Sequence, residues 1–172
     1  MLRYYTVFNV EQCEGIASPS VAPAVNAIEE CERIVRQMPN PPAFEQDGRA
    51  WYRPSTDTVG IPSRNAFNSG EEYYSTLFHE LTHSTGHTKR VGRDGIEKLN
   101  TFGSESYSKE ELIAEMGAAM LSGIAGIERK TLSNSAAYLQ SWIDVLKSDS
   151  RMVVSAASQA QKAADYIQGG AS

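Results

Sequence analysis

Two histidines and a glutamate lie close together in the segment 78–83, which reads Phe-His-Glu-Leu-Thr-His. If this segment is helical, His79 and His83 lie one turn apart on one face, where the two imidazoles can hold one zinc ion. Glu80 then lies beside the metal and can accept a proton from a bound water. Because so short a pattern also arises by chance, the rest of the chain must supply a suitable helix and a third ligand.

The third ligand has three candidates. A catalytic zinc site takes three protein ligands and keeps one position open for water. Glu111 and Glu115 are four residues apart and share one face of a second predicted helix. We expect Glu111 to bind the metal and Glu115 to accept a hydrogen bond from a ligand histidine. The reverse assignment stays open, and so does His87, which directly follows Gly86.

Each of these residues also has a purely structural interpretation. Glu111 fits a capping box with Ser108, and Glu115 fits a solvated helix glutamate. His87 fits a histidine that faces the C-terminal dipole of a helix. For the donor that stabilises an oxyanion, we consider His87, Tyr74 and Tyr107, each of which also suits a structural role.

Capping residues and apolar spacing predict the two helices that carry these side chains. Ser69 and Glu72 match a capping box and Gly86 is a stop signal, which predicts a helix over residues 70–85. A second helix is predicted from Lys109 to Gly126, with Ser108 as its cap.

Short strands precede these helices, and more helices follow. Strands are predicted over residues 2–10, 43–46, 49–53 and 58–62, and Asp47-Gly48 predicts a hairpin. Pro62 suits a sheet edge, so the strand 58–62 is expected to pair with an extended peptide. Further helices are predicted over residues 22–37, 133–147 and 149–168. The expected fold class is α+β, with a small mixed sheet, a helix that carries the histidines and a helical C-terminal half.

Composition narrows the classes of function. The 172 residues suffice for a domain with a sizeable core, and 41% hydrophobic with 22% charged residues is a globular composition. The net charge of −5 argues against a large nucleic-acid surface. No stretch approaches the ~18 apolar residues that span a bilayer. With only Cys13 and Cys31, a reducing cytoplasmic compartment is favoured.

Together these motifs resemble a known family. The histidine motif followed by Glu111-Leu112-Ile113-Ala114-Glu115 resembles the glutamate zincins. Residues 78–87, 110–119, 137–142 and 163–167 resemble the C-terminal metallopeptidase domain of ArdC antirestriction proteins and TraC-type plasmid primases. The resemblance covers nearly the whole chain and implies a zincin-like fold over residues 16–172.

The resemblance also implies a function. It implies a Zn²⁺-dependent peptidase of a mobile element, acting in the cytoplasm of a bacterial host on a peptide or protein substrate, with no membrane association. Family members usually carry an N-terminal domain that binds single-stranded DNA, and residues 1–15 resemble its last strand and linker. We therefore expect single-stranded-DNA binding only through that domain. The alternative is a non-catalytic, metal-stabilised interaction domain that binds host restriction or DNA-processing proteins.

Overall fold

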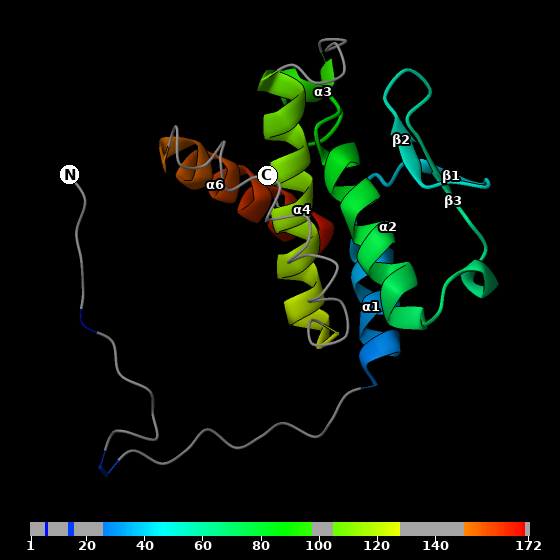
Figure 1. Ribbon diagram of the computed structural model, residues 1–172, viewed down its shortest axis with the longest axis horizontal. Coiled ribbons are helices and arrows are strands. Elements are labelled where there is room, and N and C mark those ends of the chain that lie inside the picture. The colour runs from blue at the N-terminus through cyan, green and yellow to red at the C-terminus, as the bar shows by residue number, and fades with distance from the viewer. Residues whose placement is uncertain (1–5, 7–13, 16–25, 98–104, 128–149, 171–172) are drawn as a thin grey trace.

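The computed structural model describes residues 6, 14–15, 26–97, 105–127 and 150–170 (Figure 1). Its elements are α1 (Ala27–Gln37), β1 (Ala43–Gln46), β2 (Trp51–Arg53), β3 (Thr58–Ile61), the 3-10 turn η2 (Arg64–Ala66), α2 (Gly70–Thr85), α3 (Asp94–Glu97), α4 (Glu105–Ala125) and α6 (Ser150–Ile167). The predicted α+β fold is confirmed. The helix predicted over residues 133–147 and nearly all of the segment 1–15 lie outside the described residues.

The sheet has the order β1-β3-β2, with β1 parallel and β2 antiparallel to β3. The hairpin predicted at Asp47-Gly48 is therefore wrong, because β3 lies between the two strands that it was to join. The Asp47 carboxylate instead accepts hydrogen bonds from Gly48 N at 2.5 Å and Trp51 Nε1 at 2.6 Å, which makes a local turn. The real hairpin joins β2 to β3, and Asp57 turns it with a φ of +50°.

The central position of β3 overturns the prediction of an edge strand. All four of its residues are buried, and both of its sides pair with neighbouring strands. Pro62 follows the last strand residue, so its missing N–H removes no bond of the ladder. The strand 58–62 therefore has no free edge for an extended peptide.

Helix α2 is the centre of the molecule. It packs against the sheet on one side and α4 on the other, and α6 crosses behind α4 in Figure 1 and contacts both α4 and α2. The main core joins α1, β3, α2, α4 and α6, and a second cluster joins α4 to α6. Cys31 of α1 is fully buried in the main core, where burial raises its thiol pKa to about 11. Within the described residues, no helix is both long enough and apolar enough to cross a bilayer.

The predicted bounds of α2 are confirmed, and its ends show why it begins and stops there. Ser69 Oγ accepts from Glu72 N at 3.2 Å, whereas the Glu72 carboxylate accepts from Asn68 N at 3.2 Å, one residue before the expected partner. Gly86 ends the helix with an ordinary φ of −70°, so no left-handed turn requires it. It is required by packing, since a Cβ there would lie 2.5 Å from Ile96 Cγ1.

Two predicted helix starts are wrong. Helix α1 begins at Ala27 rather than residue 22, because the Asn26 side chain accepts from Ile28 N at 3.1 Å and caps it. Helix α4 begins at Glu105, so Ser108 lies inside the helix rather than at its N-cap. The capping-box interpretation of Glu111 fails with it.

A buried arginine ties the end of α2 to the sheet. Arg90 Nε donates to Ser84 O at 2.7 Å, and Nη1 donates to Asn40 O at 2.9 Å. Its guanidinium also pairs with Asp57, whose carboxylate accepts from the Tyr52 hydroxyl at 3.0 Å. Burial raises the pKa of Asp57, but the hydrogen bonds and charge of Arg90 outweigh it and hold that pKa below its ordinary value of 3.8.

We expect Asp57→Asn to lower the free energy of unfolding at pH 7 by about 3 kcal/mol, because it leaves the Arg90 guanidinium buried without its anion. Asparagine tolerates the left-handed backbone at this position, so the change tests the charge. A carboxyl with a lowered folded pKa stabilises fully above its unfolded pKa, about 3.9, and loses that contribution as the pH falls through the folded value. Urea unfolding measured from pH 7 down to pH 3 should show the difference in free energy of unfolding between the unchanged protein and Asp57→Asn becoming smaller. A gap that stays constant would contradict this account.

Candidate metal centre

The two histidines of α2 point their outer ring nitrogens at each other. His79 and His83 are one helical turn apart, and their Nε2 atoms are 3.1 Å apart. The ring centroids are separated by 4.7 Å in an edge-to-face arrangement. His83 is buried and His79 is partly exposed. The pair therefore extends from the buried interior towards the surface along α2.

Helix α4 adds a carboxylate to this pair. One Glu111 oxygen lies 3.5 Å from His83 Nε2, and the other lies 3.8 Å from His79 Nε2. One ligand atom from each of the three residues falls within 4.8 Å of the others. Ligands at about 2.1 Å from a tetrahedral metal are roughly 3.4 Å apart, so these spacings suit a single cation.

Each histidine has a carboxylate at its inner nitrogen as well. His79 Nδ1 lies 3.2 Å from Glu115 Oε1, and His83 Nδ1 lies 3.3 Å from Glu110 Oε1. A carboxylate only accepts, so each Nδ1 carries the proton and each Nε2 of a neutral ring keeps its lone pair. Two lone pairs 3.1 Å apart repel, and a cation between them removes the repulsion. The inner partners thus prepare both rings for a metal.

Negative charge is concentrated around this pair. Glu80 is only 8% exposed, and its pKa is raised, first by burial and also by the charge of Glu111, against the opposing effect of the two histidines. Burial lowers the pKa of His79, but the hydrogen bond to Glu115 and the nearby carboxylates outweigh burial and raise it. Such a set of half-buried carboxylates favours positive charge at its centre.

Two residues beside the site were missed from the sequence. Glu110 is buried, and it receives both the His83 ring and the guanidinium of Arg93. Burial raises its pKa, but the hydrogen bonds from His83 and Arg93 outweigh burial and lower it. A signal was available for Glu110, since two ligand histidines need two acceptors and only Glu115 had been assigned to one. Arg93 had no sequence signal, because it lies in an irregular segment.

Of the three residues proposed as oxyanion donors, Tyr74 and His87 do not join the site. The Tyr74 hydroxyl donates to Glu32 Oε1 at 3.1 Å and contacts Arg64, on the α1 side of α2, so the expectation for Tyr74 is wrong. His87 Nδ1 accepts from Lys89 N at 3.1 Å, and His87 is not in the ligand group. The Tyr107 side chain lies outside the described residues.

A glycine lets the two site helices approach. A Cβ at Gly117 would lie 2.6 Å from Thr82 Cγ2 and 2.7 Å from Thr82 Oγ1. Thr82 lies directly before His83, and its Oγ1 is held by Phe78 O at 2.7 Å. Gly117 is therefore a position of α4 at which the approach to α2 requires a glycine.

A histidine pair on one helix, a carboxylate from a second helix and a glutamate next to the first histidine define a zincin type of site. The chain belongs to the zincin-like metallopeptidase family, whose match covers residues 29–159. It is similar to two Escherichia coli proteins called DNA primase TraC, at 39% identity over 166 residues and 38% over 165 residues. It is also 35% identical over 167 residues to an uncharacterized protein, y4eC, of Sinorhizobium fredii.

Solved structures agree with this family. The chain is similar to the antirestriction protein ArdC of plasmid R388 in its Mn(II)-bound form, with 36% identity and a TM-score of 0.70, and in its metal-free form, with 35% identity and a TM-score of 0.65. The resemblance to ArdC and TraC domains is therefore confirmed. Each match covers about 95% of this chain, but only 11%, 15% and 53% of the three relatives and 60% and 59% of the ArdC chains. The chain spans less than two thirds of each.

We expect Gly117→Ala to lower the free energy of unfolding by roughly 1–3 kcal/mol, because the added Cβ meets Thr82 and must push α4 away from α2. Gly123→Ala is the matched control on the same helix, since nothing lies within 4 Å of a Cβ there. That control should stabilise the protein by up to about 1 kcal/mol through helix propensity. Chemical denaturation of both variants measures the difference. Equal effects would mean that the helices do not meet at Gly117.

Proposed function

We propose that this chain is a metal-dependent peptidase domain in which His79, His83 and Glu111 hold one divalent cation. The observation that carries the proposal is the convergence of the two Nε2 atoms, 3.1 Å apart, while both Nδ1 atoms face carboxylates. Two imidazoles and a carboxylate are a ligand set used by catalytic zinc. Zinc is our first choice of metal. Manganese is the second, because the R388 relative is described as Mn(II)-bound.

The proposed reaction is hydrolysis of a peptide bond. A cation held here would supply Lewis-acid polarisation of the scissile carbonyl and an activated water. Glu80 adjoins His79 in the chain and is buried beside both rings, where it would accept a proton from the attacking water and pass it to the leaving amine. Glu115 accepts a hydrogen bond from the Nδ1–H group of His79. This bond holds the ring in the tautomer whose Nε2 lone pair can bind a metal.

The biological setting is proposed from the relatives. Their names connect this family to DNA primases and to an antirestriction protein of a plasmid, so we propose an ArdC-like domain of a mobile element that acts on a peptide or protein in the bacterial cytoplasm. Because the whole chain has a net charge of −5, we propose that single-stranded DNA is bound only through a separate N-terminal domain. The competing interaction domain shares the metal site but not the need for Glu80.

We expect Glu80→Gln to bind metal as the unchanged protein does and to lose peptidase activity by about 10²–10⁴-fold, because the amide cannot accept the proton of the water. Metal content is measured by elemental analysis after loading with Zn²⁺ or Mn²⁺. Cleavage is measured by mass spectrometry on a mixed peptide library. If the unchanged protein binds metal, cleaves nothing, and protects DNA from restriction in cells equally well with Glu80→Gln, the interaction domain is the right function.

The three-ligand assignment predicts unequal effects of two neighbouring substitutions. Glu111→Ala should abolish stoichiometric metal binding because it removes a ligand. Glu115→Ala should weaken binding by roughly 10–100-fold because it removes only the acceptor of a ligand histidine. Glu45→Ala on the exposed strand β1 is the control and should bind normally. Calorimetric titration gives the three affinities, and the opposite order would make Glu115 the ligand.

A further inference from the structure

We propose that Arg93 and Glu110 form a clamp that positions His83, holding its ring with Nε2 directed at His79 and Glu111. This inference rests on the proposed function in one respect, since metal affinity is one of its readouts. Both clamp residues act through His83 and neither lies in the ligand group. They are therefore positioning residues.

Arg93 makes a forked contact with Glu110. Its Nε donates to Glu110 Oε2 at 3.0 Å and its Nη2 donates to Glu110 Oε1 at 2.5 Å. Both side chains are only 5% exposed. Two parallel bonds fix a carboxylate in position and in orientation, which one lysine cannot do. The same Oε1 faces His83 Nδ1 at 3.3 Å, so the orientation of Glu110 is passed directly to the ring.

The guanidinium is itself fixed by the end of α2. Nη1 donates to Thr85 Oγ1 at 2.6 Å, and Nη2 donates to Thr82 O at 2.8 Å. These acceptors lie in the last turn of the helix that carries His83, where a cation is also favoured by the helix dipole. The clamp therefore binds the backbone of α2 and the carboxylate of α4 at once.

The chain between α2 and α4 is folded to bring Arg93 there. Gly92 has a φ of +72°, which a side chain would disfavour. Gly92 N donates to Thr85 O at 3.2 Å, and Arg93 N donates to Gly86 O at 2.8 Å. Gly95 leaves room for the partner, because a Cβ there would lie 3.1 Å from Glu110 Oε2.

The two histidines are held unequally. The acceptor of His79, Glu115, has a side chain that is 20% exposed, and the acceptor of His83 is enclosed with an arginine. Without Arg93, nothing would hold the Glu110 carboxylate in this orientation, because both bonds of the fork come from the guanidinium. The carboxylate would then be free to turn away from His83 Nδ1.

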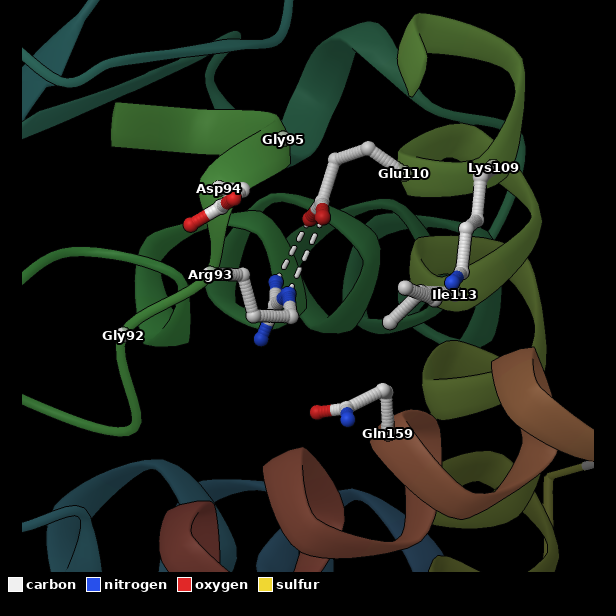
Figure 2. Close-up of a pocket in the computed structure, with 8 residues that line it drawn as sticks. All are labelled: Gly92, Arg93, Asp94, Gly95, Lys109, Glu110, Ile113 and Gln159. Atoms are coloured by element: carbon white, nitrogen blue, oxygen red, sulfur yellow. Dashed lines mark hydrogen bonds and ion pairs between the residues drawn. The ribbon is translucent and has the colours of Figure 1, made fainter. Parts of the chain in front are cut away.

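A cavity beside the clamp makes it possible to test the role of Arg93 by chemical rescue with a small cation. It has a volume of about 380 Å³, and Arg93, Glu110, Lys109, Ile113 and Gln159 are among the residues that line it. Figure 2 shows the two bonds of the Arg93–Glu110 pair at this cavity, with Gln159 of α6 opposite. A small cation that enters the cavity can therefore reach the space left by a shortened Arg93.

We expect Arg93→Ala to weaken Zn²⁺ binding by roughly 10–100-fold and millimolar guanidinium to restore most of that loss. Urea has the same planar shape without the charge and should restore nothing. Lys109→Ala, which changes another residue of the cavity, should bind Zn²⁺ normally with or without guanidinium. Equal affinity of Arg93→Ala and the unchanged protein, or equal rescue by urea, would overturn the clamp.

A second measurement needs no metal. In the metal-free protein, ¹⁵N NMR of the imidazoles should show His83 protonated at Nδ1, and Glu110→Gln or Arg93→Ala should shift it towards a mixture of tautomers. The ring of His79 should keep its tautomer in both variants. A His83 ring that is protonated at Nε2 in the unchanged protein would overturn the clamp even if metal binds. Failure of the unchanged protein to bind any metal would overturn the proposed function and leave this tautomer test intact.

Discussion

The close approach of α4 to α2 is the constraint on which the site depends. Gly117 lies against Thr82, where a single added carbon would meet the threonine side chain. Because the two helices are this close, the glutamate side chains of α4 reach the imidazoles of α2 directly. Helix α2 contributes the nitrogens and α4 contributes Glu110, Glu111 and Glu115, so neither helix forms the site alone. The sheet and α6 support these two helices from either side.

The second constraint is charge. Glu80, Glu110, Glu111 and Glu115 gather around two imidazoles in a partly buried region, which opposes folding unless positive charge is supplied. Arg93 supplies positive charge to Glu110. Glu111 lies where the Nε2 atoms converge, 3.5 Å from His83 Nε2 and 3.8 Å from His79 Nε2. A cation bound there would satisfy the charge and the lone pairs together.

Local signals predicted the elements of the site well. The helix over residues 70–85 was recognised because Ser69 caps it and because its apolar residues recur at helical spacing. The expectation that Glu111 and Glu115 share one helix face followed from their separation of one turn, and the structure brings both carboxylates to the histidines. The hairpin at Asp47-Gly48 failed because a turn signal describes only four residues, whereas strand order depends on which partner buries β3. The prediction of an edge strand over residues 58–62 was wrong for the same reason, because β3 is the central strand of the sheet.

By itself, the sequence determined the helix with its two histidines, the neighbouring Glu80 and the paired glutamates, because helical periodicity is a local property of the chain. Only the tertiary structure decided which acceptor serves which histidine, that Tyr74 turns towards Glu32, and that Arg93 joins Glu110. Those contacts join residues that are 17 to 42 positions apart. Their partners are chosen by how α1, α2 and α4 pack, and no short sequence pattern records that packing.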